Sequence, residues 1–408
     1  MANNNLKIFC VGDFCPLNKT KERIENKESF KIIEPFKNDI SKSDITVLNL
    51  EAPLTKSLKK APKFGINLKL DPICADFLKQ TGFNLAVCAN NHIGDYENGI
   101  EDSIKTLNEY KINYIGMGKN LSEAQSPFIL EKNGFKAAFI ALAENEFGMA
   151  EDNKGGSSPL SPIQNVLQIQ NLKKENNFVV VFIHGGNEYC PFPSPNTVKL
   201  YREYTNAGAD AVIASHTHCP QGYEEYNNSI IVYSLGNFIF DKIIYKNLKS
   251  KIKFLIKSFL KTKTKKLDLF NTSYAATIEL AANKKPNIEI IPFEFLEDET
   301  TIKKLENDGK NYFLSYLKYI SDIAQNSSKL KLYWDNWCFK HGKNTLNIIK
   351  KTKNFFLIKN ILTCEAHINL VQNYLTCITK NKKEDFEISK NIKMLQDGYI
   401  PKKKENNQ

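Results

Sequence analysis

Long apolar stretches are missing from this chain of 408 residues, although hydrophobic side chains make up 42% of it. No run is long enough to cross a bilayer, and the opening MANNNLKIFCVGDF lacks the charged and apolar regions of a secretory signal. The nine cysteines have no paired spacing, which argues against a disulfide scaffold and is typical of a reducing compartment. We therefore expect a cytoplasmic protein.

The familiar short signatures of catalysis are missing as well. The chain has no CxxC metal knuckle, no P-loop, no dinucleotide fingerprint and no GxSxG elbow. Nucleotide-driven ligation and serine-type hydrolysis therefore have no local support. No internal repeat is present, so a solenoid or a propeller is not expected.

Acidic residues are missing from one segment, and this segment accounts for the net charge. The chain carries +11, and residues 242–266 contain ten lysines and no acid, which leaves +1 elsewhere. Apolar residues recur there at helical spacing, which predicts a basic amphipathic helix. Such a helix can lie on an anionic membrane, hold an acidic polymer, or pack on other helices, and the sequence leaves these alternatives open. Without a recognisable nucleic-acid-binding fold, nucleic acid is not an expected partner. The apolar positions are Ile244, Leu248, Ile252, Leu255 and Phe259.

Five short apolar runs are present, and each is followed by polar side chains. LKIFCV, DITVL, FNLAVCA, FVVVFI and ADAVIA are rich in branched residues and read as strands buried on both faces. Ligands bind in open α/β folds at the carboxyl ends of the strands, so these five ends can converge on one site. The polar residues that follow the runs are Asp13, Asn49, Glu51, Asn91, His92, His184, His216 and His218.

Histidine is the most informative residue type in this set. Four of the six histidines follow these runs, and two of them stand two residues apart in SHTH. Each polar end taken alone is better explained by an ordinary cap or turn, because single motif matches are weak. Taken together they favour a metal centre, since neutral imidazole is the commonest metal ligand.

Six ordered motifs carry a resemblance to a known family, and we expect the resemblance to run over roughly three quarters of the chain. The motifs are VGDFC, LNLEAPLT, CANNHIGDYENG, IHGGNEY, GADAVIASHTHCPQGYE and YSLGNFIFD. In these motifs the chain resembles the CapA-type poly-gamma-glutamate capsule biosynthesis proteins of bacteria, which look like a branch of the calcineurin-like metallophosphatase superfamily. The resemblance implies an α/β fold in four layers, a β-sandwich flanked by helices.

The resemblance also implies a site for two divalent ions. Asp13 and His218 would hold one ion, Asn91, His184 and His216 the other, and Glu51 would bridge them. Mixed carboxylate and imidazole ligands suit manganese, iron or zinc. Paired ions activate an attacking water and neutralise charge on the attacked centre.

Other residues of these motifs are candidates for catalysis and substrate binding. His92 would act as the acid that protonates the leaving group or would steady the transition state, and Asp95 would orient it or else cap the following helix. Glu188 and Asn237 are candidates for substrate binding. Cys15 stands where related phosphoesterases carry a histidine, and we interpret it as a buried thiol rather than a ligand.

The domain organisation follows from where strand patterns stop. We expect a metallophosphatase-like domain over residues 1–297, which ends with a hairpin formed by SYAATIELAA and NIEIIPFEFL and completes the second sheet. Residues 298–400 show helical spacing, predict a helical appendage, and contain no chemistry that we can name. The polar tail 401–408 is expected to be disordered.

Two functions from different classes fit this sequence. The first is a metal-dependent hydrolase that acts on a phosphoester or an anionic polymer in capsule biosynthesis, at the inner membrane surface if residues 242–266 bind lipid. The second is a non-catalytic component that binds the polymer or assembles the machinery. A nuclease is a further, weaker alternative, because two-metal sites also cleave nucleic acid.

Overall fold

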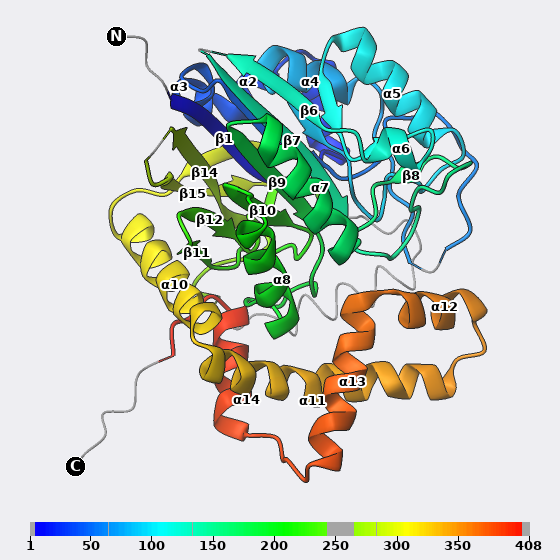
Figure 1. Ribbon diagram of the computed structural model, residues 1–408, viewed down its shortest axis with the longest axis vertical. Helices are drawn as coiled ribbons and strands as arrows, with labels where there is room; N and C mark the ends of the chain where they lie inside the picture. Colours follow the sequence, from blue (N-terminus) through cyan, green and yellow to red (C-terminus); the bar gives the residue numbers. More distant parts are fainter. Residues whose placement is uncertain (1–4, 64, 133, 243–264, 283, 402–408) are drawn as a thin grey trace.

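In the computed structural model, which describes residues 5–63, 65–132, 134–242, 265–282 and 284–401, two β-sheets are packed together between layers of helices (Figure 1). The helix predicted at 242–266 lies outside the described residues except for its ends, and so do residues 402–408 of the tail. Those two predictions are therefore untested. The predicted four-layer α/β arrangement with a helical C-terminal region is confirmed.

The larger sheet has eight strands in the order β16-β15-β14-β1-β2-β3-β4, with β13 also paired to β1. The six-stranded sheet has the order β11-β12-β10-β9-β7-β6, and β5 pairs with β8 in a small separate sheet. The strands are β1 (Asn5–Cys15), β2 (Ile45–Leu50), β3 (Leu85–Val87), β4 (Asn113–Ile115), β5 (Met117–Gly118), β6 (Phe128–Lys132), β7 (Phe135–Ala143), β8 (Gly156–Ser157), β9 (Phe178–His184), β10 (Ala211–Ser215), β11 (Tyr223–Tyr226), β12 (Ser229–Val232), β13 (Asn237–Phe240), β14 (Thr272–Ala281), β15 (Asn287–Leu296) and β16 (Thr301–Lys304).

The alternation of side chains along the strands explains the layers. In β1, Ile8 and Cys10 belong to the core between the two sheets, while Phe9 and Val11 belong to the core under the helices. Successive residues of a strand point to opposite faces, so a continuous apolar run fills both cores at once. The runs that predicted these strands were apolar throughout for this reason.

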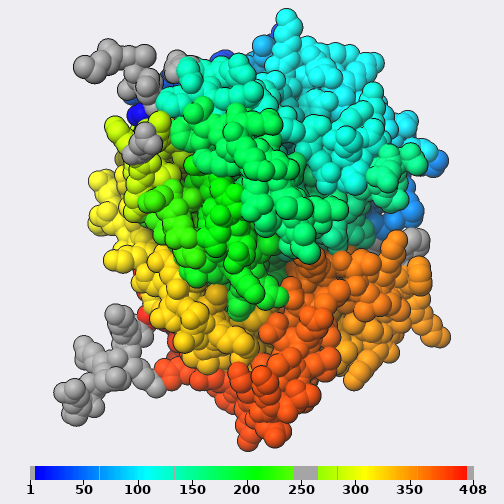
Figure 2. All heavy atoms as spheres, viewed as in Figure 1, coloured from blue at the N-terminus to red at the C-terminus, as the bar shows by residue number. Residues whose placement is uncertain are grey.

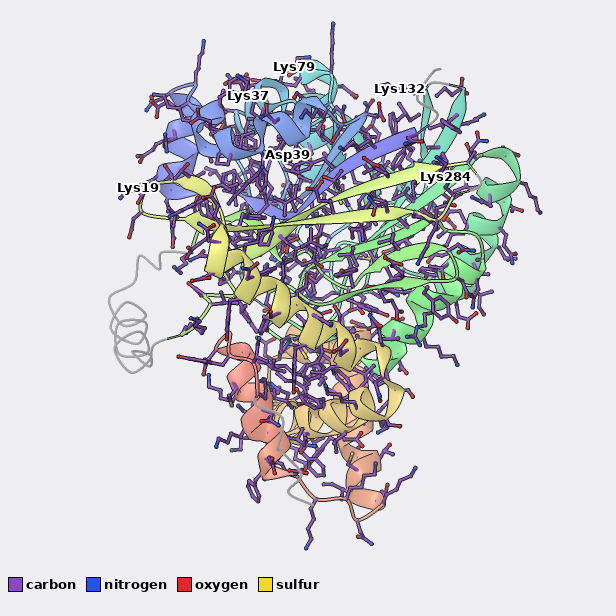
Figure 3. All side chains as sticks on the ribbon, turned by 90° about the vertical axis from the view of Figure 1, so that its left-hand side faces the viewer. Lys19, Lys37, Asp39, Lys79, Lys132 and Lys284 are labelled. Carbon is purple, nitrogen blue, oxygen red and sulfur yellow. The ribbon has the colours of Figure 1, made fainter. Side chains whose placement is uncertain are left out.

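Helices cover the outer faces of both sheets, and Figure 3 shows the layers from the side. The elements α1 to α5 with η1 cover the eight-stranded sheet, while α7 and α8 lie against the six-stranded sheet. In that view the labelled Lys132 and Lys284 mark the end of the sheets that is far from the C-terminal helices. The covering elements are α1 (Asn18–Glu25), α2 (Ser29–Ile33), η1 (Glu34–Phe36), α3 (Lys37–Ser41), α4 (Cys74–Thr81), α5 (Gly99–Tyr110), α6 (Leu121–Ala124), α7 (Pro162–Glu175) and α8 (Pro195–Asn206).

The C-terminal region is helical, as predicted, and packs against one end of the sandwich (Figures 1 and 2). The contact is close where α10 crosses β11, since a side chain at Gly222 would meet the Ser321 backbone at 2.6 Å. Phe192 packs edge-on against Trp337 across the same boundary, which joins the two regions through a shared apolar core. The helices are α10 (Asn307–Gln325), α11 (Ser327–Lys351), α12 (Phe355–Thr363), α13 (Glu365–Thr379) and α14 (Phe386–Gln396).

The predicted hairpin forms, but it does not complete the second sheet. β14 and β15 pair in antiparallel fashion, with Ser273 opposite Phe293. β14 also pairs with β1, so the hairpin extends the eight-stranded sheet, which continues through β16. The sequence pattern identified the two strands. It does not specify with which further strand a hairpin pairs, and here that strand is β1.

All nine cysteines are free, and all of them are buried. Within the described ranges, no helix combines the length and the apolar character needed to cross a membrane. The cytoplasmic location stays a prediction.

Candidate metal centre

The ends of parallel strands bring the predicted site residues together. β1, β2 and β3 run parallel in one sheet, and β9 and β10 run parallel in the other. The register sets Asp13 beside Asn49 and beside Asn237, and it sets His184 beside Ser215. Segments that lie far apart in sequence therefore supply one cluster at the carboxyl edge of the sandwich.

Two groups of buried side chains could each hold a metal ion. Asp13, Glu51 and His218 form one group, while Glu51, His184 and His216 form the other. In each group the potential ligand atoms lie within 4.8 Å of one another, and Glu51 belongs to both. Asn91 joins the second group, because its Oδ1 lies 3.1 Å from His184 Nε2. The six residues predicted as ligands thus occupy one site.

Glu51 has the least satisfied environment in this cluster. Its side chain is fully buried, and neither carboxylate oxygen has a hydrogen-bond partner among the described residues. The nearest imidazole nitrogens, Nε2 of His218 and Nε2 of His184, lie 3.6 and 3.9 Å from Oε1, which is too far for a hydrogen bond. Burial, reinforced by the neighbouring Asp13 carboxylate, raises the pKa of Glu51 well above its ordinary value. Buried charges in proteins are paired or coordinate metals, so this carboxylate fits a cation.

The two imidazoles of the second group are close enough together that one ion could contact both. His216 Nδ1 lies 3.0 Å from His184 Nε2. Burial, together with the charges of His216, His218 and His92, lowers the pKa of His184 well below its ordinary value. His184 is therefore neutral at physiological pH, and neutral imidazole is the form that binds a metal.

Two asparagines hold the ligand side chains in place. Asn49 donates from Nδ2 to Asp13 Oδ1 at 2.7 Å, and the same nitrogen lies 3.2 Å from His184 Nδ1. Asn237 places its Oδ1 2.9 Å from His218 Nδ1 and donates from Nδ2 to the carbonyl of Phe270. These contacts place Asn237 next to the Nδ1 side of the His218 ring. The substrate-binding role predicted for Asn237 stays a prediction.

The backbone of the SHTH segment is strained. His216 has φ of 101° and His218 has φ of 51°, both in the left-handed region that side chains with a Cβ rarely adopt. Such strain costs about 1–3 kcal/mol per residue and concentrates at functional sites.

Gly12, which precedes Asp13 in β1, lies very close to a neighbouring backbone segment. A Cβ at Gly12 would lie 1.7 Å from the carbonyl oxygen of Gly236. Only glycine allows this approach, which also lets Asp13 donate its N–H to Gly236.

His92 is oriented beside the cluster by two charged side chains. Its Nδ1 lies 2.6 Å from Asp95 Oδ2 and 3.1 Å from Lys63 Nζ, and Lys63 also forms an ion pair with Asp95. The helix that follows begins at Gly99, so Asp95 does not cap it. Burial lowers the pKa of His92, with Lys63 acting in the same direction, although the contact with Asp95 opposes the shift.

The remaining candidates lie at the margin of the cluster. Glu188 is exposed on the loop after β9, and its substrate-binding role stays a prediction. Cys15 is fully buried, and burial raises the pKa of its thiol well above the ordinary value, in agreement with its interpretation as a buried thiol. It does not belong to either potential metal group.

Three contributors to this site were missed in the sequence: Lys63, Glu146 and Asn360. Glu146 accepts a hydrogen bond from Asn91 Nδ2 at 2.6 Å. It follows the apolar run FKAAFIALA, so the strand-end pattern that located the predicted site residues could have located Glu146 too. Lys63 and Asn360 stand in segments without such a signal.

The fold and the cluster together define a class: an α/β sandwich whose strand ends gather buried histidines and carboxylates that could hold metal ions. The profile of the family described as bacterial capsule synthesis protein PGA_cap matches residues 7–242. The chain belongs to this family, which confirms the resemblance seen in the sequence.

Relatives support the same assignment. The capsule biosynthesis protein CapA of Bacillus anthracis is 30% identical over 254 residues, which cover 59% of this chain and 61% of that protein. The PGA biosynthesis protein CapA of Bacillus subtilis (strain 168) is 31% identical over 247 residues, which cover 59% of this chain and 65% of that protein. The matched part thus spans less than two thirds of either relative.

Among solved structures, a hypothetical protein from Thermus thermophilus is similar at 14% identity with a TM-score of 0.41. The similarity covers 70% of this chain and 99% of that one.

Proposed function

We propose that the protein is a metal-dependent hydrolase that acts on a phosphoester or another anionic substrate during biosynthesis of a capsule or related surface polymer. The observation that carries this proposal is the buried Glu51 carboxylate, which has no partner in the described chain and belongs to both potential metal groups. Family membership supports the biosynthetic context, since the relatives named above carry capsule or PGA biosynthesis in their names.

The chain would divide its ligands between two ions. Asp13 and His218 would bind one, Asn91, His184 and His216 would bind the other, and Glu51 would bind both. When bound, divalent ions of the manganese, iron or zinc type supply an activated water at neutral pH and stabilise negative charge on the attacked centre. The contacts from Asn49 and Asn237 would keep the ligands in place, as outer partners do in other metal sites.

His92 would transfer a proton to the leaving group. Its Nδ1 contacts Asp95 and Lys63, which leaves Nε2 as the ring nitrogen for the substrate. Asp95 would set the orientation of the ring and stabilise its protonated form, while Lys63 would hold Asp95 in place through the ion pair between them. Proton transfer by a positioned side chain contributes about 10²- to 10⁴-fold to the rate of such reactions.

The substrate class follows from the chemistry of the site. A pair of divalent ions favours an anionic group, and both a phosphoester and a polymer of acidic units provide one. We propose the same substrates as partners of the chain, with an anionic membrane as a further partner of residues 242–266.

Metal content and turnover of the purified full chain test the proposal. We expect two bound ions per chain by elemental analysis, and metal-dependent hydrolysis in a screen of generic phosphoesters and gamma-glutamyl compounds. His92→Ala should keep both ions and lose about 10²- to 10⁴-fold in turnover. His341→Ala is the matched control, because His341 stacks on Trp337 in α11 and should leave turnover unchanged.

Other outcomes decide between the two classes of function. If the chain binds polymer, and His92→Ala changes neither the binding nor any turnover, a non-catalytic polymer-binding component replaces the hydrolase. If the wild-type chain takes up no divalent ion, the metal centre itself is refuted.

A further inference from the structure

Glu146 links the predicted metal ligand Asn91 to the C-terminal helices. β7 ends at Ala143, and the loop that follows brings the Glu146 carboxylate between two amides. Oε2 accepts from Asn91 Nδ2 at 2.6 Å, and Oε1 accepts from Asn360 Nδ2 at 3.4 Å. Asn360 lies on α12, 214 residues further along the chain, and is 4% exposed.

The chemistry of this contact fixes which atom of Asn91 faces the metal cluster. Glu146 accepts the hydrogen bond through its carboxylate oxygen, so it contacts the NH₂ group of Asn91 and not the amide oxygen. The carbonyl oxygen is thereby directed to the other side, where it lies 3.1 Å from His184 Nε2. An amide binds a divalent cation through oxygen, so the orientation set by Glu146 is the one that a cation needs.

A second helix of the C-terminal region also faces Glu146, because His367 lies close enough to interact with its carboxylate. His367 belongs to the first turn of α13, so two helices of the C-terminal region face this one carboxylate.

α12 and α13 lie beyond residue 242, where the match to the family profile ends. His367 is further evidence that α12 and α13 border the site. Its Nδ1 is buried and has no hydrogen-bond partner in the described part of the chain. The charge of His367 also interacts with Glu146, Glu188 and His216. The helical region thus reaches the cluster, although its sequence contains no recognisable motif.

We propose that Glu146 and Asn360 are positioning residues of the metal centre: Glu146 orients the Asn91 amide for a cation, and Asn360 holds Glu146 from the C-terminal region. This inference rests on the proposed function, because it presumes that Asn91 binds a metal. The helical region would then stabilise the position of Glu146 through Asn360, and Glu146 would in turn orient Asn91.

Titration of the full-length protein with Mn²⁺, followed by calorimetry, tests the inference without any assay of turnover. Glu146→Ala should weaken the site that contains Asn91 by about 10- to 100-fold, the usual effect of removing an outer partner of a ligand. Glu146→Gln should recover most of this affinity, because its amide oxygen can still accept from Asn91. Asn360→Leu should weaken the same site by roughly fivefold, the effect of one ordinary hydrogen bond.

Asn369→Ala provides the matched control for a lost amide contact between the two regions. Asn369 on α13 accepts from Asn196 at 3.1 Å on the exposed side of the boundary, so Mn²⁺ affinity should not change. If Glu146→Ala folds poorly, Asn360→Leu and Glu146→Gln still decide the question.

Three outcomes separate this inference from the proposed function. Wild-type protein that binds no Mn²⁺ refutes the metal centre. Wild-type protein that binds two ions, with Glu146→Ala and Asn360→Leu binding them equally well, overturns only the positioning role. If Asn369→Ala lowers the Mn²⁺ affinity as much as the other variants do, the loss comes from weaker packing between the helical region and the sandwich. This result also overturns the positioning role.

Discussion

Two buried carboxylates show how the strand-end region and the helical region differ. Glu51 after β2 is fully buried and has no hydrogen-bond partner among the described residues, whereas Asp335 on α11 is 5% exposed and contacts both Lys331 and Lys382. Burial raises the pKa of Glu51 well above its ordinary value. Burial acts on Asp335 too, but hydrogen bonds from the two lysines outweigh it and lower the pKa.

The comparison shows which buried carboxylate has close partners within the chain and which one has no hydrogen-bond partner among the described residues. Asp335 is neutralised by its own helix and by the segment before α14, so its environment is complete. In the described part of the chain, Glu51 has no hydrogen-bond partner, and its contacts with His184 and His218 are long. A bound cation reverses such a local pKa shift, so the environment of Glu51 should respond to metal and that of Asp335 should not.

The largest expected effect comes from replacing the shared ligand. Glu51→Gln keeps the shape but removes the charge that both potential metal groups use. We expect Mn²⁺ binding to be lost at both sites and turnover to fall by more than about 100-fold, since even outer partners of ligands contribute about 10- to 100-fold. Calorimetric titration and turnover measure this. Asp335→Asn, the matched variant in the helical region, should leave both unchanged, and an equal loss in the two variants would contradict the comparison.

Removal of metal should destabilise only a protein whose Glu51 is intact. A ligand present at about 100 times its Kd stabilises the folded state by about 2.7 kcal/mol. A chelator should therefore lower the thermal midpoint of the wild-type chain and leave that of Glu51→Gln unchanged. Scanning calorimetry with and without chelator gives both values. A wild-type midpoint that does not respond to chelation or to added Mn²⁺ would contradict a metal centre at Glu51.

Breaking the ion pairs of Asp335 should reduce stability without affecting metal binding. Lys331 and Lys382 are about half exposed, so they can return to water when the carboxylate is removed. We expect Asp335→Ala to lower the free energy of unfolding by about 1 kcal/mol, nearer the value for an exposed pair than for a fully buried one. Denaturant unfolding measures the change. A loss of bound Mn²⁺ in this variant would show that the two regions are not separable in this way.

Asp241, which directly follows β13, should make the stability of the protein depend on pH. Burial raises its pKa from 3.8 to about 7, although Thr20 and the backbone of Leu17 donate to it. The folded state therefore binds the proton more tightly than the unfolded state. This contribution to stability is full below pH 4 and is lost as the pH rises towards 7, with a slope of at most about 1.4 kcal/mol per pH unit.

Asp241→Asn should remove that slope between pH 4 and 7. Unfolding free energies of the two proteins across this range test it. The contribution of Asp335 to stability changes with pH in the opposite direction. Because its pKa is lowered on folding, this contribution is present above pH 4 and is lost as the pH falls. Identical pH profiles for wild-type and Asp241→Asn would show that the Asp241 carboxyl does not titrate differently on folding.

The sequence predicted the strand-end residues well because their signal is local. An apolar run followed at once by Asp, Asn, Glu or His is visible in a short window, and parallel pairing in each sheet then brings such ends together. Helical spacing in the C-terminal region was visible in the same way and agrees with α10 to α14, whereas Thr301–Lys304 of the range predicted as helical form the strand β16.

Contacts between distant segments could not be predicted in this way. Lys63 stands in a segment without a regular pattern, yet its side chain is only 4% exposed beside Asp95. Asn360 reaches Glu146 only because α12 is folded back on the sandwich. The pairing of β14 with β1 was also missed, since it depends on which sheet edge is free and not on the residues of the hairpin itself. In each case tertiary packing, and not local sequence, decides the contact.

The most direct test of the metal centre is anomalous scattering from crystals of the full chain grown with Mn²⁺. We predict two peaks, one beside Asp13 and His218 and one beside Asn91, His184 and His216, with the Glu51 carboxylate in contact with both. Crystals without a peak at the strand ends, or with a single peak that does not touch Glu51, would contradict the account.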